Sequence, residues 1–224
     1  MNECPICAGY GRVRSPAGVY RDCECTLRRR AEQRARELRE ASGIPDGIFE
    51  RLTLDTWQPS QVRAPRCNAT EILAACRAYA ERPDGWLVIM GPVGVGKTHL
   101  AYGIAGDVLR RGGAVYAANV PSMLGMIRSG FGAGISAEQR IEQLRAVDVL
   151  VLDDWGTERT TDWVSEVLFA VLDARYLRRT PTVVTTNLPL HDMAAKGDRL
   201  ASRLMDRELS HVLVLNAGDY RRRA

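Results

Sequence analysis

Lysine is nearly absent from this 224-residue chain, which has 31 Lys and Arg side chains but only two lysines, Lys97 and Lys196. Long apolar runs are also missing. No stretch reaches the roughly 18 apolar residues of a membrane-spanning helix, and the opening MNECPICAGYGRVR lacks the apolar core of a secretory signal. We therefore expect a cytoplasmic protein without membrane contact, whose six cysteines are metal ligands or buried thiols rather than disulfides.

The net charge of +4 is modest, but arginine is unevenly distributed. Residues 1–41 carry nine arginines against six acidic residues, and the chain ends in Arg221-Arg222-Arg223-Ala224. This distribution is compatible with a nucleic-acid partner and equally with a solvated, arginine-rich surface. The length and the 46% hydrophobic fraction suit one α/β domain with a small appendage.

A phosphate-binding loop follows the apolar run Leu87–Met90. The sequence GPVGVGKT has the G-x-x-x-x-G-K-[ST] pattern, and helical spacing begins after it. Backbone N–H groups of such a loop surround phosphates, Lys97 reaches the β and γ phosphates of a nucleotide, and Thr98 ligates Mg²⁺. We predict a nucleotide site that comprises Gly91, Pro92, Val93, Gly94, Val95, Gly96, Lys97, Thr98 and His99.

A second buried run, Val149–Leu152, delivers two carboxylates at its end. Because a phosphate loop precedes it, this is a Walker B pattern, in which Asp153 holds Mg²⁺ together with Thr98, and Asp154 is the general base. The strand at 182–187 ends in Asn187, which could position the attacking water. We predict catalytic roles for Lys97, Asp153, Asp154 and Asn187.

The remaining pattern alternates strands and helices. We expect five strands in a parallel, doubly wound α/β sheet, at about 87–90, 114–118, 149–154, 182–187 and 211–215. Helices are expected at about 68–81 and 161–178, with two more in 122–145 separated by a break at 130–134. Within those two, the arginines could face a phosphate backbone or simply solvent.

Two close cysteine pairs mark the N-terminal region. Cys4, Cys7, Cys23 and Cys25 form C-x-x-C and C-x-C pairs, separated by fifteen residues that include turn-forming glycines. This spacing predicts a small zinc-ribbon-like module, with two unrelated thiol pairs as the alternative. A charged helix at 27–41 follows as a connector or partner-binding arm. We place the module at 1–45 and an ATPase domain at 46–224.

Five motifs together resemble the DnaC/DnaI-type helicase loaders of the AAA+ ATPases, whose relatives include IstB-type transposition helpers. They are GPVGVGKTHL, VLVLDDWG, RYLRRTPTVVTTN, GDRLASRL and DYR. The resemblance implies that Asn187 is the sensor-1 residue, that Arg203 is an arginine finger acting on a neighbouring subunit, with Arg199 as second candidate, and that Arg221 is the sensor-2 arginine. It also implies ATP, Mg²⁺ and Zn²⁺ as cofactors.

Two departures from the family pattern stand out. The Walker B motif ends in Asp-Asp where AAA+ proteins commonly have Asp-Glu, which predicts slow hydrolysis stimulated by DNA or a partner. The chain also ends soon after Arg221, so we expect a reduced or absent C-terminal lid.

The resulting hypothesis is an ATP-dependent loader that forms an AAA+ oligomer. It binds the hexameric replicative DNA helicase through residues 1–45, and places that helicase on single-stranded DNA. By the same resemblance, the helices at 122–145 contact the DNA. The main alternative is an IstB-type helper that binds duplex DNA and recruits a transposase. A small-molecule kinase and a non-hydrolysing adaptor are further alternatives.

Overall fold

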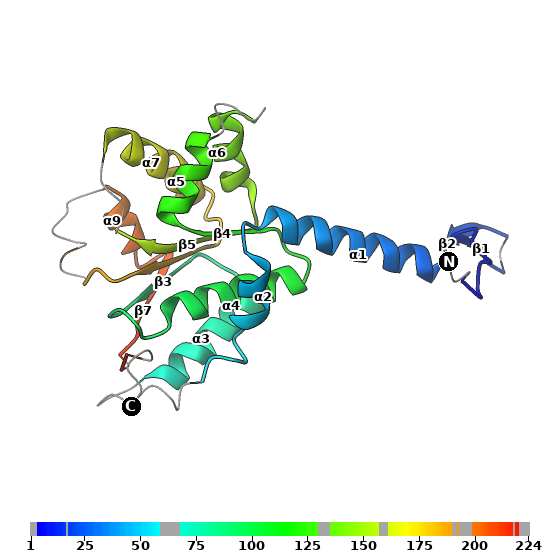
Figure 1. Ribbon diagram of the computed structural model, residues 1–224, viewed down its shortest axis with the longest axis horizontal. Coiled ribbons are helices and arrows are strands. Elements are labelled where there is room, and N and C mark those ends of the chain that lie inside the picture. The colour runs from blue at the N-terminus through cyan, green and yellow to red at the C-terminus, as the bar shows by residue number, and fades with distance from the viewer. Residues whose placement is uncertain are drawn as a thin grey trace.

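A five-stranded parallel sheet organises the larger part of the molecule (Figure 1). The computed structural model describes residues 4–16, 18–58, 68–129, 135–156, 161–189, 192, 199–216 and 218–219. The spatial strand order is β4-β5-β6-β3-β7. Each strand end lies within one residue of its prediction. The strands are β3 (Trp86–Met90), β4 (Val115–Asn119), β5 (Val149–Trp155), β6 (Thr182–Thr186) and β7 (Ser210–Val214).

Helices cover both faces of this sheet, because its central strands are apolar on both sides. One face packs on α3 (Ala69–Glu81) and α4 (Lys97–Arg110). The other packs on α5 (Val120–Ser129), α6 (Ala137–Ala146), α7 (Asp162–Leu177) and α9 (Arg199–Leu204). Figure 1 shows these two groups on opposite sides of the strands. The predicted doubly wound α/β architecture is confirmed.

The expected helices at 68–81 and 161–178 are α3 and α7, and the pair expected in 122–145 is α5 and α6. The predicted break at 130–134 lies outside the described residues. Helix α6 begins with a capping box, in which Ser136 and Gln139 exchange hydrogen bonds. The reduced or absent C-terminal lid stays a prediction.

Arg175 joins three elements in the interior. Its side chain is fully buried and donates to the carbonyls of Leu144 at 3.0 Å, Val147 at 2.9 Å and Pro181 at 2.5 Å. It also donates to Thr182 Oγ1 at 2.9 Å. Burial lowers the pKa of this guanidinium to about 10, so it stays charged at neutral pH and satisfies carbonyls at the end of α6.

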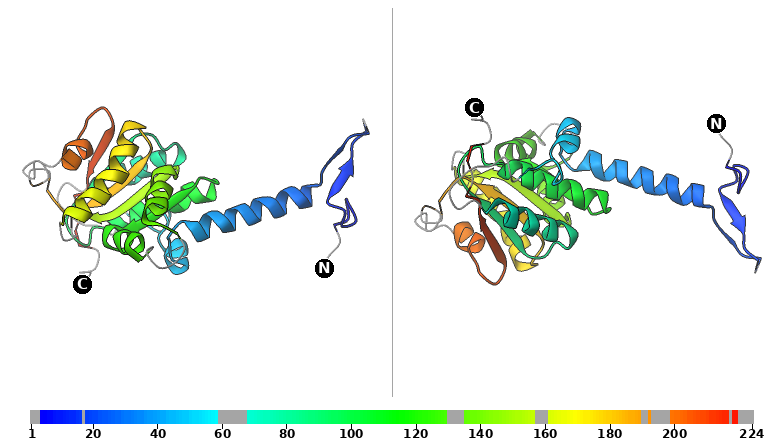
Figure 2. Two further views of the ribbon diagram at one scale, coloured as in Figure 1. Left: turned by 90° about the horizontal axis from the view of Figure 1, so that it is seen from above. Right: turned by 90° about the horizontal axis from the view of Figure 1, so that it is seen from below.

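A long helix, α1 (Glu24–Ala41), projects from the body and carries the N-terminal residues at its far end (Figure 2). At about 1.5 Å per residue its 18 residues span roughly 27 Å. Residues 27–37 are all exposed. Leu38 and Ile44 are buried in the core that contains α3 and α4, and the Ala117 N–H donates to Ser42 O at 2.8 Å. The predicted division at residue 45 stays a prediction.

Helix α2 (Asp46–Arg51) holds the base of α1. Arg39 pairs with Glu50 at 2.5 Å and Asp46 at 3.1 Å, and its guanidinium lies 4.4 Å from the centre of the Phe49 ring. Beyond the far end of α1, the strands β1 (Arg12–Arg14) and β2 (Tyr20–Asp22) form an antiparallel hairpin. In the part of the chain that is described, no helix combines the length and the apolar character that a membrane span requires.

Candidate functional site

The phosphate loop connects β3 to α4 at the carboxyl edge of the sheet, where ligands of open α/β folds bind. Gly94 and Gly96 have φ of +85° and +96°, which L side chains rarely adopt. A Cβ on Gly96 would also lie 2.5 Å from Trp57 Nε1, and one on Gly94 would lie 2.0 Å from Asp219 Oδ1. The backbone conformation therefore favours glycine at both positions, and at Gly96 the Trp57 ring adds a second reason.

Lys97 lies at the start of α4, and its side chain is nearly buried. Its ammonium donates to Gly91 O and Pro92 O, each at 2.8 Å, and to Asn187 Oδ1 at 2.5 Å. The predicted lysine and the predicted sensor asparagine are thus in direct contact. A compact ammonium held inside a glycine loop suits the binding of nucleotide phosphates.

Thr98 and Asp153 converge as the Mg²⁺ prediction requires. Thr98 Oγ1 donates to Asp153 Oδ1 at 3.0 Å, across the interface between α4 and β5. Burial raises the pKa of Asp153, while hydrogen bonds from Thr185 and Thr98 act in the opposite direction. A hydroxyl and a carboxylate oxygen are hard ligands of the type that Mg²⁺ prefers. Thr98 and Asp153 fit the ion and would hold it, and the ion would supply positive charge that neutralises the phosphates of a bound nucleotide.

Asp154 lies in a β-bulge. Leu152 pairs with Val184 and Trp155 with Thr186, so Asp153 and Asp154 together oppose the single residue Thr185. Asp154 has a φ of +59°, a left-handed conformation that Asp and Asn tolerate better than Glu does. The local backbone therefore gives a physical reason for aspartate where the family pattern commonly has glutamate.

The cavity beside the loop has a volume of about 1260 Å³. The predicted residues Val93, Gly94, Val95, Gly96, Lys97, Thr98, His99, Asp153, Asp154 and Asn187 all line it. A second wall of the cavity was not predicted. It is formed by α2 and the residues that follow it, and it comprises Ile48, Arg51, Leu52, Thr56, Trp57 and Gln58. Trp57, a large aromatic residue among turn-forming residues, is the feature of the sequence that could have indicated this wall.

His99 lines the cavity but is held by the protein itself. Its Nε2 lies 2.8 Å from Thr53 O and 3.1 Å from Thr56 Oγ1, so the ring connects α4 to the segment that contains Trp57. Burial lowers the pKa of His99. Its predicted contact with nucleotide stays a prediction.

The predicted arginines differ in their placement. Arg203, on α9, forms an ion pair with Asp173 and lies 4.9 Å from the ring centres of both Phe169 and Tyr176. Arg199, the second finger candidate, is exposed. Arg221 lies outside the described residues. The arginine-finger and sensor-2 roles stay predictions.

Two arginines of the helices expected to contact DNA have partners inside the molecule. Arg128 on α5 lies 4.5 Å from the centre of the Trp163 ring. Arg145 on α6 donates to Ala170 O at 2.9 Å. These contacts favour a structural role for both arginines, and DNA contact by α5 and α6 stays a prediction.

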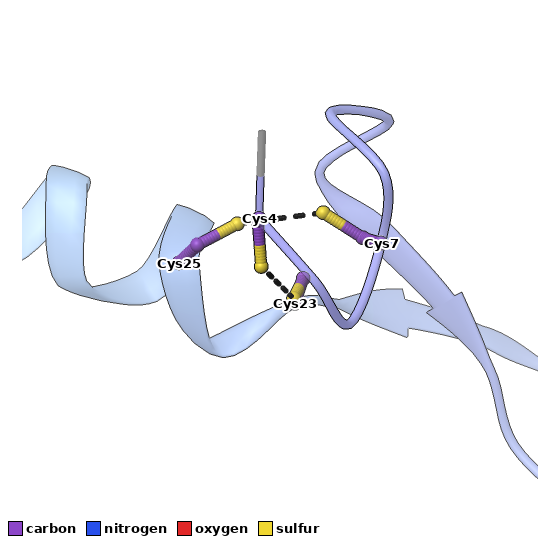
Figure 3. A group of neighbouring side chains, drawn as sticks. All are labelled: Cys4, Cys7, Cys23 and Cys25. Carbon is purple, nitrogen blue, oxygen red and sulfur yellow. Dashed lines mark hydrogen bonds between the residues drawn. The ribbon is translucent and has the colours of Figure 1, made fainter. Parts of the chain in front are cut away.

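The four N-terminal cysteines do come together (Figure 3). Their sulfur atoms all lie within 4.8 Å of one another. Cys4 and Cys7 lie in the turn before β1, Cys23 immediately precedes α1, and Cys25 lies in the first turn of that helix. Because Cys23 is extended and Cys25 is helical, a C-x-C pair can direct both sulfurs to one point.

The surroundings of this cluster act differently on its thiols. A backbone hydrogen bond at Cys25 lowers the pKa of Cys23, but burial and hydrogen bonds with the other cysteines raise it overall, to about 12. The Gly11 N–H donates to Cys7 Sγ at 3.2 Å and Arg29 Nη2 to Cys25 Sγ at 3.8 Å, and a hydrogen bond from Cys7 lowers the pKa of Cys25 to about 6. The positive end of the α1 dipole adds to this effect. A four-sulfur donor set of this size fits Zn²⁺, which binds four thiolates tetrahedrally.

The sequence model described as IstB-like ATP binding protein matches residues 28–224. The chain belongs to this family. The match begins at Arg28, so all four cluster cysteines lie outside it. Family membership and the fold identify an ATP-binding protein with the fold of AAA+ ATPases.

Relatives come from two functional groups. The replicative helicase loader DnaC of Escherichia coli K12 is 31% identical over 158 residues, which are 67% of this chain and 63% of DnaC. A putative ATP-binding protein in an insertion sequence of Mycobacterium tuberculosis is 32% identical over 141 residues, which are 61% of this chain and 56% of that protein. This chain thus aligns with less than two thirds of the length of either.

A crystal structure of the DnaC helicase loader superposes with a TM-score of 0.64, at 24% identity, covering 77% of this chain and all of that one. Together with the relatives, this confirms the resemblance to DnaC-type AAA+ proteins. The superposition shows the fold alone.

Proposed function

We propose that this protein is an ATP-dependent loader of a replicative helicase onto single-stranded DNA, acting in the cytoplasm as an AAA+ oligomer. The observation that carries the proposal is the cysteine module held outside the ATP-binding body by α1. A DnaC relative supports the loader branch of the family, and a separate zinc-stabilised module gives such a loader a surface for its partner.

Apolar exposure supports partner binding by that module. Nine large apolar side chains are exposed in the described part of the chain, and five of them lie within its first 27 residues: Ile6, Tyr10, Val19, Tyr20 and Leu27. Exposed apolar side chains that gather in one region favour a protein-binding surface. The helicase is the partner that we assign to it.

The ATP site would act as a switch. Lys97 and the loop amides hold the phosphates, and Thr98 and Asp153 would hold Mg²⁺, which neutralises phosphate charge. Asp154 accepts a proton from the attacking water, and Asn187 orients the Asp154 carboxylate through the hydrogen bond from its Nδ2. An arginine from a neighbouring subunit would make hydrolysis depend on assembly.

The second candidate is a transposition helper that binds duplex DNA and recruits a transposase. The mycobacterial insertion-sequence relative favours it, and every residue of the ATP site serves either function equally well. Only the partner and the form of DNA distinguish the two proposals.

The deciding experiment is reconstitution with the purified replicative helicase of the host and circular single-stranded DNA. We expect ATP to increase the amount of helicase retained on the circle, and expect the double variant C4S/C7S to lose this effect while still binding ATP. Lys97→Ala serves as the nucleotide-binding control. ATP-dependent binding of duplex DNA and of the transposase, without helicase retention, would instead establish the helper function.

A further inference from the structure

Strand β6, TVVTT, buries three threonine hydroxyls, and each is used differently. Thr182 Oγ1 accepts from Arg175 Nε, and Thr186 Oγ1 donates to Trp155 O at 2.8 Å. Thr185 Oγ1 donates to the Asp153 carboxylate, with 2.6 Å between Oγ1 and Oδ1. A buried hydroxyl costs free energy unless it is hydrogen-bonded, and of these three only Thr185 directs its proton at an acidic side chain.

Thr185 also accepts a hydrogen bond. The Asp154 N–H donates to Thr185 Oγ1 at 2.9 Å. One hydroxyl therefore contacts both members of the Walker B pair, the first through its carboxylate and the second through its backbone. This is possible because the bulge of β5 places Asp153 and Asp154 opposite the single residue Thr185.

We propose that Thr185 is a positioning residue for ATP hydrolysis, in that its hydroxyl sets the orientation of the Asp153 carboxylate and holds the bulge that aims Asp154. The inference rests on the proposed ATPase function and adds one residue to its site. Thr185 lies outside the phosphate loop and the Walker B pair, and it is distinct from Asn187.

The first half of this role concerns the metal ligand. Asp153 Oδ1 accepts from Thr185 and from Thr98, two hydroxyls that come from different elements. These contacts limit rotation of the carboxylate, so that it faces α4 and the phosphate loop. Without the Thr185 hydroxyl the carboxylate keeps only one of these two contacts, and its affinity for Mg²⁺ falls.

The second half concerns the base. A φ of +59° at Asp154 is costly for a side-chain-bearing residue, and it persists only where surrounding contacts hold it. The hydrogen bond from the Asp154 N–H to Thr185 is such a contact. In this backbone conformation the Asp154 carboxylate accepts from Asn187 Nδ2 at 2.8 Å, so loss of the bond would misdirect the base.

The test compares three variants. Thr185→Val keeps the shape and removes the hydroxyl, Thr185→Ser keeps the hydroxyl, and Thr186→Val removes an equally buried hydroxyl that binds Trp155 O instead of a carboxylate. For each we would measure turnover, KM, the Mg²⁺ concentration for half-maximal nucleotide binding, nucleotide affinity in chelator, and Tm.

Thr185→Val is expected to lose about tenfold to a hundredfold in kcat, the size typical of one lost charge-assisted hydrogen bond. We also expect it to need severalfold more Mg²⁺ and to bind nucleotide normally in chelator. Thr185→Ser should retain most turnover. Thr186→Val should lower Tm without changing either the Mg²⁺ requirement or kcat by more than about twofold.

Wild-type kcat and Mg²⁺ requirement in Thr185→Val would overturn the inference, and so would equal defects in Thr185→Ser and Thr185→Val, since the methyl group would then matter rather than the hydroxyl. If the wild type hydrolyses no ATP even with DNA and helicase, the proposed function fails. In that event the Mg²⁺ dependence of nucleotide binding still decides whether Thr185 positions Asp153.

Discussion

The side-chain amide of Asn187 donates to Asp154 Oδ1 at 2.8 Å, while its own Oδ1 accepts from Lys97. The Lys97 ammonium can only donate and the Asp154 carboxylate can only accept. These two partners therefore determine which way round the Asn187 amide is oriented. Asn187, which follows β6 directly, thus connects Lys97 to the Asp154 carboxylate in β5.

Replacing Asn187 with Ala should therefore reduce turnover more than nucleotide affinity. We expect kcat to fall by about a hundredfold, because Asp154 loses the donor that orients it, and Kd for ATP to change by less than about threefold. Asn187→Asp is a matched control of similar shape, and it should fail as well because it places a second carboxylate against Asp154. Equilibrium nucleotide binding and single-turnover hydrolysis measure the two quantities; normal turnover in the Asn187→Ala protein would contradict the role.

Asp154→Asn should keep the fold and lose hydrolysis. Asn tolerates the left-handed backbone as well as Asp does, so Tm should be unchanged, while loss of the base should cost about 10²- to 10⁴-fold in kcat. Asp154→Glu should lower the free energy of unfolding by about 1 kcal/mol and should not increase turnover. A Glu variant that is both stable and faster than wild type would show that the bulge places no such constraint on the base.

Arg203→Ala should destabilise the protein, which a free arginine finger would not do. The side chain is only 18% exposed, pairs with Asp173 and packs on Phe169 and Tyr176, so truncation should cost about 1 to 2 kcal/mol. Arg199→Ala should leave Tm unchanged because Arg199 is exposed. Chemical denaturation checks stability, and DNA-stimulated hydrolysis of each variant checks the finger role. If only Arg199→Ala lost stimulation, the finger would be Arg199.

Zinc analysis should find one ion per chain, bound by the four cysteines. Cys7 and Cys23 are the only buried side chains in the described residues 4–25, so that region has no apolar core and should unfold when the metal is removed. We expect chelation to abolish helicase binding and to leave ATP affinity within about twofold. A chain that contains no zinc as purified, yet binds helicase, would contradict the assignment.

Acidification should reduce the stability that the buried His99 contributes, because burial disfavours its charged form. Burial lowers the folded-state pKa of His99 below its ordinary value near 6.5. The unfolded state therefore binds the proton more readily, so this contribution is complete above about pH 6.5 and is lost progressively as the pH falls from there through the lower folded-state pKa. We expect the Tm difference between wild type and His99→Gln to shrink from pH 7.5 to 5.5; a constant difference would argue against it.

The regular elements were predictable because their signals are local. Short runs of apolar and β-branched residues predicted all five strands, and the phosphate loop and the Val149–Asp154 pattern predicted part of the lining of the cavity. The convergence of the four cysteines was also predictable from spacing alone.

Features that depend on contacts between elements far apart in the sequence were not predictable. A two-for-one bulge at Asp153 and Asp154 depends on the register of β6, which the sequence of β5 does not contain. The ion pair of Arg203 depends on where α9 meets α7. Likewise, Arg175 is the first residue of the motif RYLRRTPTVVTTN, but only the packing shows that it donates to carbonyls at the end of α6.

Helix α1 also determines the direction in which the cysteine module faces around the helix axis. It is one uninterrupted helix whose base is clamped through Arg39 and Leu38, so each residue added to its exposed part turns the module by about 100° and advances it by about 1.5 Å. An insertion of seven residues would restore nearly the original direction at a greater reach, whereas one of two would turn the module to almost the opposite side. In an oligomer, the length of this helix would therefore determine the direction in which every module points.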